Sequence, residues 1–270
     1  MRLTATALLT TGLLLGLVAA AAGQQTPTPV PPTATPRPPV ATPTPNPAER
    51  LADRAIGNLA AWKLNTADNI LAGGQAEFGP TPEYKTARGY LRAAQGKFDE
   101  GTSLLRAAAS AKPVDPAPQY YLGEVFNWRK KAADADAAWK AARARAKALT
   151  DAEPGNARAQ YYLGAARLRL KDFGPARTAL EAARSAGFDA AMVDYQVGLS
   201  HILEEKWQLA VESFDKVIAR DAKFAHAYYY RGLAHGELGH KDRMLVDMDL
   251  FVAYAPRAPE TAMARLYLQH

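Results

Sequence analysis

The side chains that most often carry catalysis or bind metals are few, and they lack the spacing that such chemistry needs. The five histidines are His201, His226, His235, His240 and His270, and there is no cysteine. A zinc site needs three or four ligands at regular spacing, and the sequence contains no HExxH, no HxH and no carboxylate cluster. His201 and His235 occupy equivalent positions of two successive repeats, which are described below. We interpret the histidines as satisfied or surface residues.

Nucleophilic and phosphate-binding motifs are also absent. No GxSxG sequence, glycine-rich phosphate loop or calcium-binding loop occurs, and the serines have no patterned histidine and aspartate partners. Without cysteine there is no thiol catalysis, no disulfide and no cysteine-linked lipid. We therefore expect a protein that is not an enzyme and that needs no cofactor and no metal.

A recurring tyrosine and glycine pattern indicates which elements organise the chain. Four segments place a tyrosine three residues before a glycine: Tyr120–Gly123, Tyr161–Gly164, Tyr195–Gly198 and Tyr229–Gly232. The last three glycines are evenly spaced, and Gly89 precedes Gly123 by the same interval. Only the step from Gly123 to Gly164 differs, because it is longer by seven residues. A fixed period of this length, about 34 residues, is typical of a repeat protein.

Two further positions recur, twelve and sixteen residues after each glycine. The first holds a small residue in most repeats: Gly101, Ala135, Ala176 and Ala210, with Met244 as the exception. The second holds a large apolar residue: Leu105, Trp139, Leu180, Phe214 and Met248. Ala67 and Leu71 occupy the same two positions one period earlier, which predicts a weaker additional repeat over about 48–80.

The pattern within each repeat predicts two short antiparallel helices. Apolar residues recur at helical spacing in each half, and breaks such as Gln95-Gly-Lys, Leu170-Lys-Asp and Leu238-Gly-His separate the halves. Small residues let two helix backbones approach, and we expect the large residue four positions later to fill the space between neighbouring hairpins. One hairpin cannot bury its apolar stripe alone, so stacked hairpins must share a core.

These features resemble the tetratricopeptide repeat, in which an aromatic residue, Leu-Gly, an alanine, a phenylalanine-like residue and a proline recur with the same period. The resemblance covers about residues 48–256. It implies an all-α fold, a right-handed α–α superhelix with about five clear hairpins, one degenerate N-terminal hairpin and a C-terminal capping helix. The expected units are about 48–80, 82–113, 116–154, 157–188, 191–222 and 225–256, with the capping helix at 258–269. The family's first aromatic position departs from the pattern in four units: Lys85, Gln119, Gln160 and Asp194, with only Tyr228 conforming.

The resemblance also implies a binding site. The family binds extended peptides or partner helices on a concave face built from the first helix of each hairpin. Residues three before, one after, and four and five after the glycines should project onto that face. The candidate groove residues are Tyr120, Glu124, Asn127, Trp128, Tyr161, Leu168, Arg169, Tyr195, Leu199, Tyr229 and Glu237. Tyrosine offers a large amphipathic surface and arginine can bind a carboxylate with two hydrogen bonds. The alternative is that the tyrosines only pack hairpin against hairpin.

The seven additional residues between Gly123 and Gly164 correspond to about two helical turns. Residues 133–150 are rich in alanine and contain no proline or glycine. We therefore expect the insertion to lengthen the second helix of that hairpin without rotating its apolar face. Lys140, Arg143, Arg145 and Lys147 form a basic ridge on this helix, which we interpret as a solvated face.

The first 47 residues differ in composition from the rest of the chain. Residues 1–22 combine Arg2, a leucine-rich stretch and a run of small residues ending at Ala22, which is typical of a cleaved signal peptide; the alternative is an uncleaved N-terminal anchor. Residues 23–47 contain ten prolines and should form a disordered, extended Pro/Thr-rich linker, which can carry O-glycans. Both interpretations predict an exported protein, periplasmic or extracellular, that contacts a membrane only through an uncleaved N-terminal segment.

The net charge of +6 does not indicate a nucleic-acid partner. Without Arg2 and Arg37 the chain has 31 basic and 27 acidic residues, and they are interspersed. Nucleic-acid-binding domains instead concentrate positive charge on one face.

The sequence therefore favours one function and leaves two alternatives open. We expect a non-catalytic, exported scaffold that binds a protein or peptide partner in its concave groove, in envelope assembly or secretion. The alternatives are a glycan- or cell-wall-binding module and an accessory subunit of an envelope enzyme.

Overall fold

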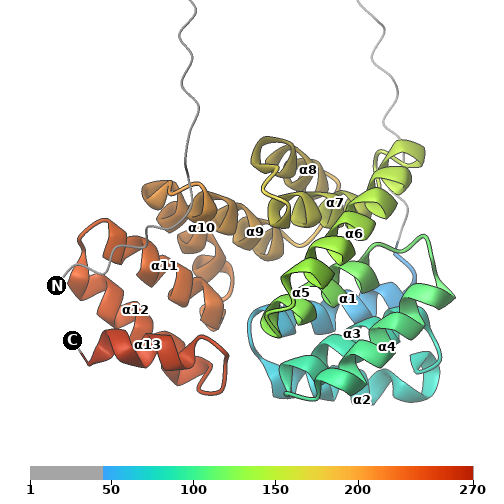
Figure 1. Ribbon diagram of the computed structural model, residues 1–270, viewed down its shortest axis with the longest axis horizontal. Helices are drawn as coiled ribbons and strands as arrows, with labels where there is room; N and C mark the ends of the chain where they lie inside the picture. The colour runs from blue at the N-terminus through green and yellow to red at the C-terminus, as the bar shows by residue number, and fades with distance from the viewer. Residues whose placement is uncertain (1–44, 270) are drawn as a thin grey trace, which may run out of the picture. The chain divides into compact units, whose positions relative to one another are not determined.

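A computed structural model describes residues 45–269, which contain thirteen α-helices and no β-strand (Figure 1). The expected signal peptide (1–22) and the expected linker up to residue 44 lie outside the described residues. No helix between residues 45 and 269 combines the length and the hydrophobicity needed to cross a lipid bilayer.

The helices follow one another with short connections. Their bounds are α1 Pro47–Ala60, α2 Leu64–Phe78, α3 Pro82–Ala94, α4 Phe98–Ala111, α5 Ala117–Trp128, α6 Ala132–Ala152, α7 Ala157–Arg169, α8 Phe173–Ser185, α9 Ala190–Leu203, α10 Trp207–Arg220, α11 Ala225–Glu237, α12 Lys241–Tyr254 and α13 Thr261–Leu268. Each odd-numbered helix up to α11 packs against the helix that follows it, and each hairpin packs against the next (Figure 1). The expected all-α superhelix of stacked hairpins is confirmed. The weaker first repeat also forms a hairpin, α1–α2, with Ala67 and Leu71 fully buried.

One turn residue in every hairpin adopts a left-handed backbone conformation. The six residues are Trp62, Gly96, Lys130, Lys171, Glu205 and Gly239. They recur with the period of the core glycines, including the longer step between Lys130 and Lys171. A left-handed conformation costs a non-glycine residue about 1 kcal/mol, so four of the six turns are strained.

Close packing inside each hairpin explains the period of the glycines. A Cβ added to four of the five would collide with the large residue sixteen positions later; the pairs are Gly89–Leu105, Gly123–Trp139, Gly164–Leu180 and Gly198–Phe214. At Gly232 the added Cβ would lie 3.0 Å from Cε of Met248, a tight contact. At Gly164 this Cβ would lie 2.7 Å from Cγ of Leu180 and 2.9 Å from the carbonyl oxygen of Ala176. The large residue thus packs on the glycine of its own hairpin, whereas the sequence pattern predicted that it fills the space between neighbouring hairpins.

The long second helix of the third hairpin is confirmed. α6 has 21 residues, whereas the other helices of the six hairpins have 12 to 15. Along α6, Lys140 forms an ion pair with Asp136 (2.6 Å) and Lys147 with Asp151 (2.7 Å). Two of the four charges of the basic ridge are therefore compensated within the helix.

The two ends of the stack contact each other through the turn after α1. The N–H of Ala225 donates to the carbonyl oxygen of Ala61 (3.3 Å), and Lys63 forms an ion pair with Asp221 (2.6 Å). Trp62 packs edge-on against the ring of His226, with 5.3 Å between the ring centroids. The stack therefore curves until its first hairpin meets the loop between α10 and α11.

His226 joins this contact to the residue that precedes α13. Its Nδ1 lies 3.2 Å from the carbonyl oxygen of Ala60, and its Nε2 lies 3.3 Å from Oε2 of Glu260. Both partners are acceptors, so the imidazole can donate to both only when both ring nitrogens carry a proton. Burial alone would raise the pKa of the Glu260 carboxyl, but the hydrogen bond and charge of His226 outweigh burial and lower that pKa.

The C-terminal helix α13 begins three residues later than the expected cap at 258–269. It packs on α12, with Thr261 and Ala264 buried. Met263 and Leu266 point away from the stack and are about half exposed, at 49% and 50%.

We expect Gly101→Ala to destabilise the protein. A Cβ at Gly101 would lie 2.6 Å from the carbonyl oxygen of Gly89 and 2.9 Å from the nitrogen of Ala93, so the backbones of α3 and α4 must separate. Overpacking costs about 1–3 kcal/mol, more than the ~1 kcal/mol that alanine gains over glycine in a helix. Urea unfolding followed by circular dichroism measures the difference.

Gly57→Ala is the matched control, because no atom lies within 4 Å of a Cβ added there. This variant should raise the free energy of unfolding by up to about 1 kcal/mol. Equal effects of the two substitutions would contradict the role assigned to the close helix contact.

We expect Glu260→Gln to lower the free energy of unfolding by about 1 kcal/mol at pH 6. Because the folded-state pKa of Glu260 is lowered, its carboxylate stabilises the fold above its unfolded pKa, and this contribution disappears as the pH falls through the folded pKa. The difference between wild type and variant should therefore shrink below about pH 4. Chemical unfolding at several pH values measures it. Glu237→Gln, at an exposed position, should have no effect, and a wild-type advantage that stayed constant down to pH 3 would argue against the His226–Glu260 contact.

Candidate functional site

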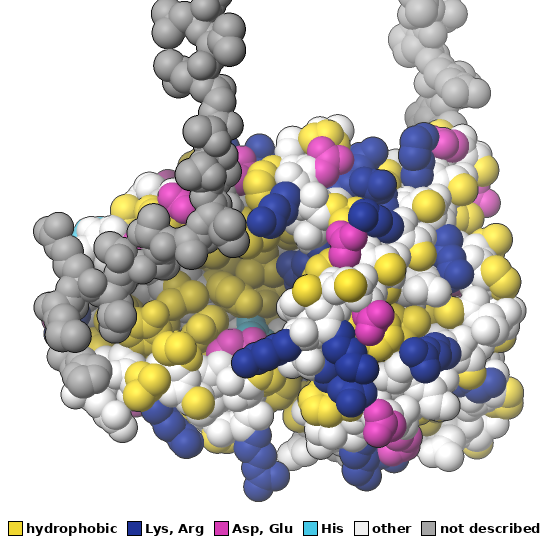
Figure 2. Space-filling view, in the orientation of Figure 1, with side chains coloured by type: hydrophobic (Ala, Val, Ile, Leu, Met, Phe, Trp, Pro, Cys, Tyr) yellow, Lys and Arg dark blue, Asp and Glu magenta, His cyan; other side chains and the backbone are white. Residues whose placement is uncertain are grey.

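The odd-numbered helices from α1 to α11, together with Trp139 of α6, line a cavity of about 380 Å³ on the inner side of the stack. We call it the groove cavity. Its lining residues are Ile56, Leu59, Ala60, Tyr90, Tyr120, Tyr121, Glu124, Asn127, Trp128, Trp139, Tyr161, Arg169, Lys171, Met192, Tyr195, Gln196, Leu203, His226, Tyr230 and Glu260. Tyrosine and tryptophan supply eight of these residues, and α1 supplies part of the wall from the first hairpin. Figure 2 shows an apolar hollow in the surface with Lys and Arg side chains beside it.

The structure brings most of the candidate groove residues together at this cavity. The residues that line it are Tyr120, Glu124, Asn127, Trp128, Tyr161, Arg169 and Tyr195. Partner binding by these residues stays a prediction.

Four candidates lie elsewhere. Leu168 and Leu199 are buried in the apolar core. Tyr229 packs against the ring of Phe251, with 5.0 Å between the ring centroids, and Glu237 is exposed at the end of α11. Adjacent residues of a helix point about 100° apart. Leu168 therefore faces the core although Arg169 beside it lines the cavity.

Tyr120 and Tyr161 form the buried floor of the groove cavity. They are only 2% and 1% exposed. Nε2 of Gln196 donates to the hydroxyl oxygens of Tyr161 (3.1 Å) and Tyr120 (3.4 Å), and Phe188 stacks on the Tyr161 ring at 4.3 Å. Burial raises the pKa of both tyrosine hydroxyls, so both are neutral. These two tyrosines pack hairpin against hairpin and present only part of their surface to the cavity.

Glu124 and Arg169 form a doubly hydrogen-bonded ion pair in the cavity wall. Nε of Arg169 donates to Oε1 of Glu124 (2.7 Å) and Nη2 to Oε2 (2.9 Å), while Nε1 of Trp139 donates to Oε1 (3.1 Å). Burial opposes the charge of Arg169, but the Glu124 carboxylate outweighs burial and raises the pKa of the guanidinium. Arg169 thus binds a carboxylate with two hydrogen bonds, but this carboxylate belongs to the protein itself.

Solvent reaches the groove cavity at its mouth. Leu203, the last residue of α9, is 48% exposed, and Asn127 and Lys171 are exposed as well. Trp128 is partly buried, because its ring stacks on Tyr90 at 5.2 Å and meets another tryptophan edge-on. The mouth therefore presents an apolar side chain, an indole ring, an amide and an ammonium group above the floor.

Sequence reasoning missed several lining residues for different reasons. Leu203 lies five residues after Gly198, the position that Trp128 and Arg169 occupy in their repeats, so the same projection identifies it. Ile56 lies one period before Tyr90, at the position one residue after the repeat glycine, but Ala55 stands there in place of that glycine, so counting from glycines alone does not reach it. Glu260 follows the last hairpin and carries no repeat signal, and the contact between the ends of the stack brings it to the cavity.

The histidines form no metal site within residues 45–269. No group of three or more histidine and carboxylate residues there could hold a metal ion. Burial lowers the pKa of His201 and of His235, so both are neutral at pH 7. His235 lies beside His240, with 5.7 Å between the ring centroids, and His270 is outside the described residues.

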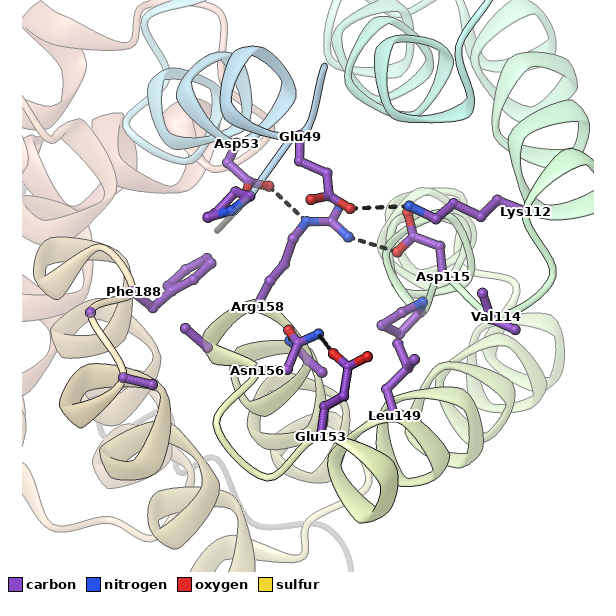
Figure 3. Close-up of a pocket in the computed structure, with 16 residues that line it drawn as sticks. Glu49, Asp53, Lys112, Val114, Asp115, Leu149, Glu153, Asn156, Arg158 and Phe188 are labelled. Atoms are coloured by element: carbon purple, nitrogen blue, oxygen red, sulfur yellow. Dashed lines mark hydrogen bonds and ion pairs between the residues drawn. The ribbon is translucent and has the colours of Figure 1, made fainter. Parts of the chain in front are cut away.

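A second cavity, of about 470 Å³, lies near the N-terminal ends of α1, α5 and α7 (Figure 3). Arg158 forms ion pairs with Asp53 (3.0 Å) and Asp115 (2.8 Å), and Lys112 with Glu49 (3.0 Å). Figure 3 shows these side chains pointing toward one another across the cavity. The charges compensate one another and connect α1 to α7, to the end of α4 and to the segment before α5. We interpret this network as structural.

Comparison with known proteins supports the fold. No protein-family model matches the sequence, and a search among curated proteins finds no match. TTC0263, a thermophilic TPR protein from Thermus thermophilus, has a TM-score of 0.55 and 17% identity, and the match covers 70% of this chain and 100% of that one. A chain of the APC/C hetero-tetramer Cut9–Hcn1 has a TM-score of 0.51 and 13% identity, and the match covers 83% of this chain and 42% of that one. The resemblance seen in the period of the glycines is confirmed at the level of the fold: the chain has the α–α superhelical fold of tetratricopeptide repeat proteins.

Proposed function

We propose that this protein is a non-catalytic scaffold that binds a segment of a partner protein in the groove cavity. The observation that carries the proposal is the mouth of the cavity, where Leu203, Trp128 and Asn127 stand above an aromatic floor. Binding sites of this kind combine an apolar interior with a few polar groups that fix orientation. At about 380 Å³ the cavity suits individual side chains of a partner rather than a folded domain.

The cavity is organised before any partner arrives. The Glu124–Arg169 pair, the bonds from Gln196 to the tyrosines and the stacking of Trp128 on Tyr90 hold its walls through contacts inside the protein. A preorganised site loses little side-chain entropy on binding. This supports a binding role over one in which the groove is only a space between helices.

The aromatic side chains favour a peptide over a glycan as ligand. Sugars stack on open aromatic faces, whereas Tyr161 is stacked on Phe188, and Trp128 on Tyr90. The glycan- or cell-wall-binding alternative therefore has less support from the cavity than peptide binding has.

The proposal includes export. Its support is the sequence of residues 1–22, with a leucine-rich stretch followed by small residues, and the proline-rich segment that follows. A scaffold outside the cytoplasm would serve envelope assembly or secretion, a role that rests on fold analogy and targeting.

We expect a photo-crosslinking amino acid at position 127 to form an adduct with a partner protein in the source cells. Leu203→Glu should lower the yield of this adduct about tenfold, because it places a charge at the apolar mouth of the cavity. Leu209→Glu is the matched control, since Leu209 is 45% exposed but lies on α10 outside the cavity lining. Two results would exclude the groove as the binding site. One is an equal adduct yield from a crosslinker at position 178 on α8, and the other is an adduct yield from position 127 that Leu203→Glu does not change.

We expect the protein isolated from its source to begin near residue 23. N-terminal sequencing of the protein from fractionated cells measures this, and a variant lacking residues 1–22 should remain in the cytoplasm. An intact N-terminus in the membrane fraction would favour the uncleaved anchor. Full-length protein in the cytoplasmic fraction would refute export.

A further inference from the structure

Two turns next to the groove cavity carry a lysine where an unstrained turn has a glycine. Gly96 and Gly239 occupy the left-handed position of the second and sixth hairpins, whereas Lys130 (φ 57°) and Lys171 (φ 62°) occupy it in the third and fourth. Each lysine costs about 1 kcal/mol relative to glycine. Both side chains are exposed and have no ion pair or hydrogen bond to any residue between 45 and 269. Their strain is therefore not offset by a side-chain ion pair or hydrogen bond in that part of the chain, and such strain concentrates at functional sites.

Most acidic residues close to these turns are paired with arginine. Asp99 pairs with Arg129 (3.0 Å), Glu100 with Arg92 (2.9 Å) and Asp172 with Arg167 (3.7 Å). The lysines of three successive turns are consequently left without an acidic partner in the described part of the chain. We call these four residues the lysine rim: Lys97, Lys130, Lys131 and Lys171.

The lysine rim is confined to the middle of the stack. In the first hairpin Lys63 pairs with Asp221, and in the fifth Lys206 pairs with Glu204. The second, third and fourth hairpins pack in succession, so their equivalent turns are neighbours. Lys171 itself lines the groove cavity, and Lys130 follows Trp128 of the cavity by two residues. Positive charge thus adjoins the apolar mouth at the turns of the third and fourth hairpins, whereas the turn of the fifth carries the exposed Glu205 two residues after Leu203. Figure 2 shows basic side chains beside the apolar hollow.

We propose that the lysine rim selects an acidic partner segment: carboxylates of the partner face Lys130, Lys131 and Lys171, while an adjacent apolar side chain enters the groove cavity beside Trp128 and Leu203. This inference rests on the proposed function and adds the chemistry of the partner. Exposed charges attract an oppositely charged partner over about a Debye length and suppress partners of like charge. The apolar cavity beside the cations favours an acidic peptide over a nucleic acid.

An array of random twelve-residue peptides tests the proposal with the full-length protein. We expect the bound peptides to be enriched in Asp or Glu next to Leu, Phe or Trp. The acidic enrichment should weaken strongly in high salt, because salt screens exposed charges, whereas the apolar enrichment should remain.

The double variant Lys130→Gly, Lys171→Gly separates binding from folding. It removes the strain of two turns, so its melting temperature should rise, while its affinity for a selected acidic peptide should fall about tenfold, as expected for two lost charge contacts. Glu205→Gly is the matched control, because Glu205 occupies the same left-handed position in the fifth hairpin. It should raise the melting temperature without weakening the binding of the peptide.

The outcomes distinguish this inference from the proposed function. The acidic selection would be refuted if the bound peptides were enriched in apolar but not in acidic residues and the double glycine variant bound them as tightly as the wild type. Binding in the groove would remain supported by that result. Bound peptides with no compositional preference at all would count against both. Displacement of the selected peptide by single-stranded DNA more readily than by polyglutamate would assign the lysine rim to nucleic acid and refute the peptide assignment.

Discussion

The structure depends on how closely the two helices of a hairpin can approach. At Gly164 the backbone of α7 lies so near α8 that even a Cβ would collide with Leu180 and with the carbonyl oxygen of Ala176. A large side chain packs against the equivalent glycine in five hairpins, so each hairpin offers the next one a surface of similar shape. Stacking follows from this regularity, because a hairpin that cannot bury its apolar stripe alone finds a matching neighbour. The packing of the two helices within each hairpin therefore also positions the inner face and the residues of the groove cavity on it.

Features that repeat were predictable from the sequence. Residue spacing predicts the hairpins, the position of their turns and the longer α6. Both the helical period and the repeat period can be found in the sequence without knowledge of the structure. Ala67 and Leu71 were sufficient to reveal the first hairpin. Contacts between Trp62, Lys63, Asp221 and His226 were not predictable, because no period relates residues that meet only when the stack curves.

The candidate site was predictable in position and less so in chemistry. Counting from the glycines places Trp128 and Arg169 correctly at the cavity, because helical geometry fixes which face a residue occupies. It cannot show that Glu124, on a neighbouring helix, already holds Arg169, nor that Gln196 bridges two tyrosine hydroxyls. Such pairings depend on distances between helices, which spacing along one helix does not contain.

The contact between the ends of the stack has a consequence for how the protein loses its structure. Linear repeat arrays fray from a terminus, since a terminal repeat has one neighbour fewer than the others. Here the hydrogen bond from Ala225 to Ala61 and the Lys63–Asp221 pair give the first hairpin a second neighbour. Detaching either terminus removes support from the other, so melting of this chain resembles the all-or-none transition of a globular domain more than the unzipping of an open array.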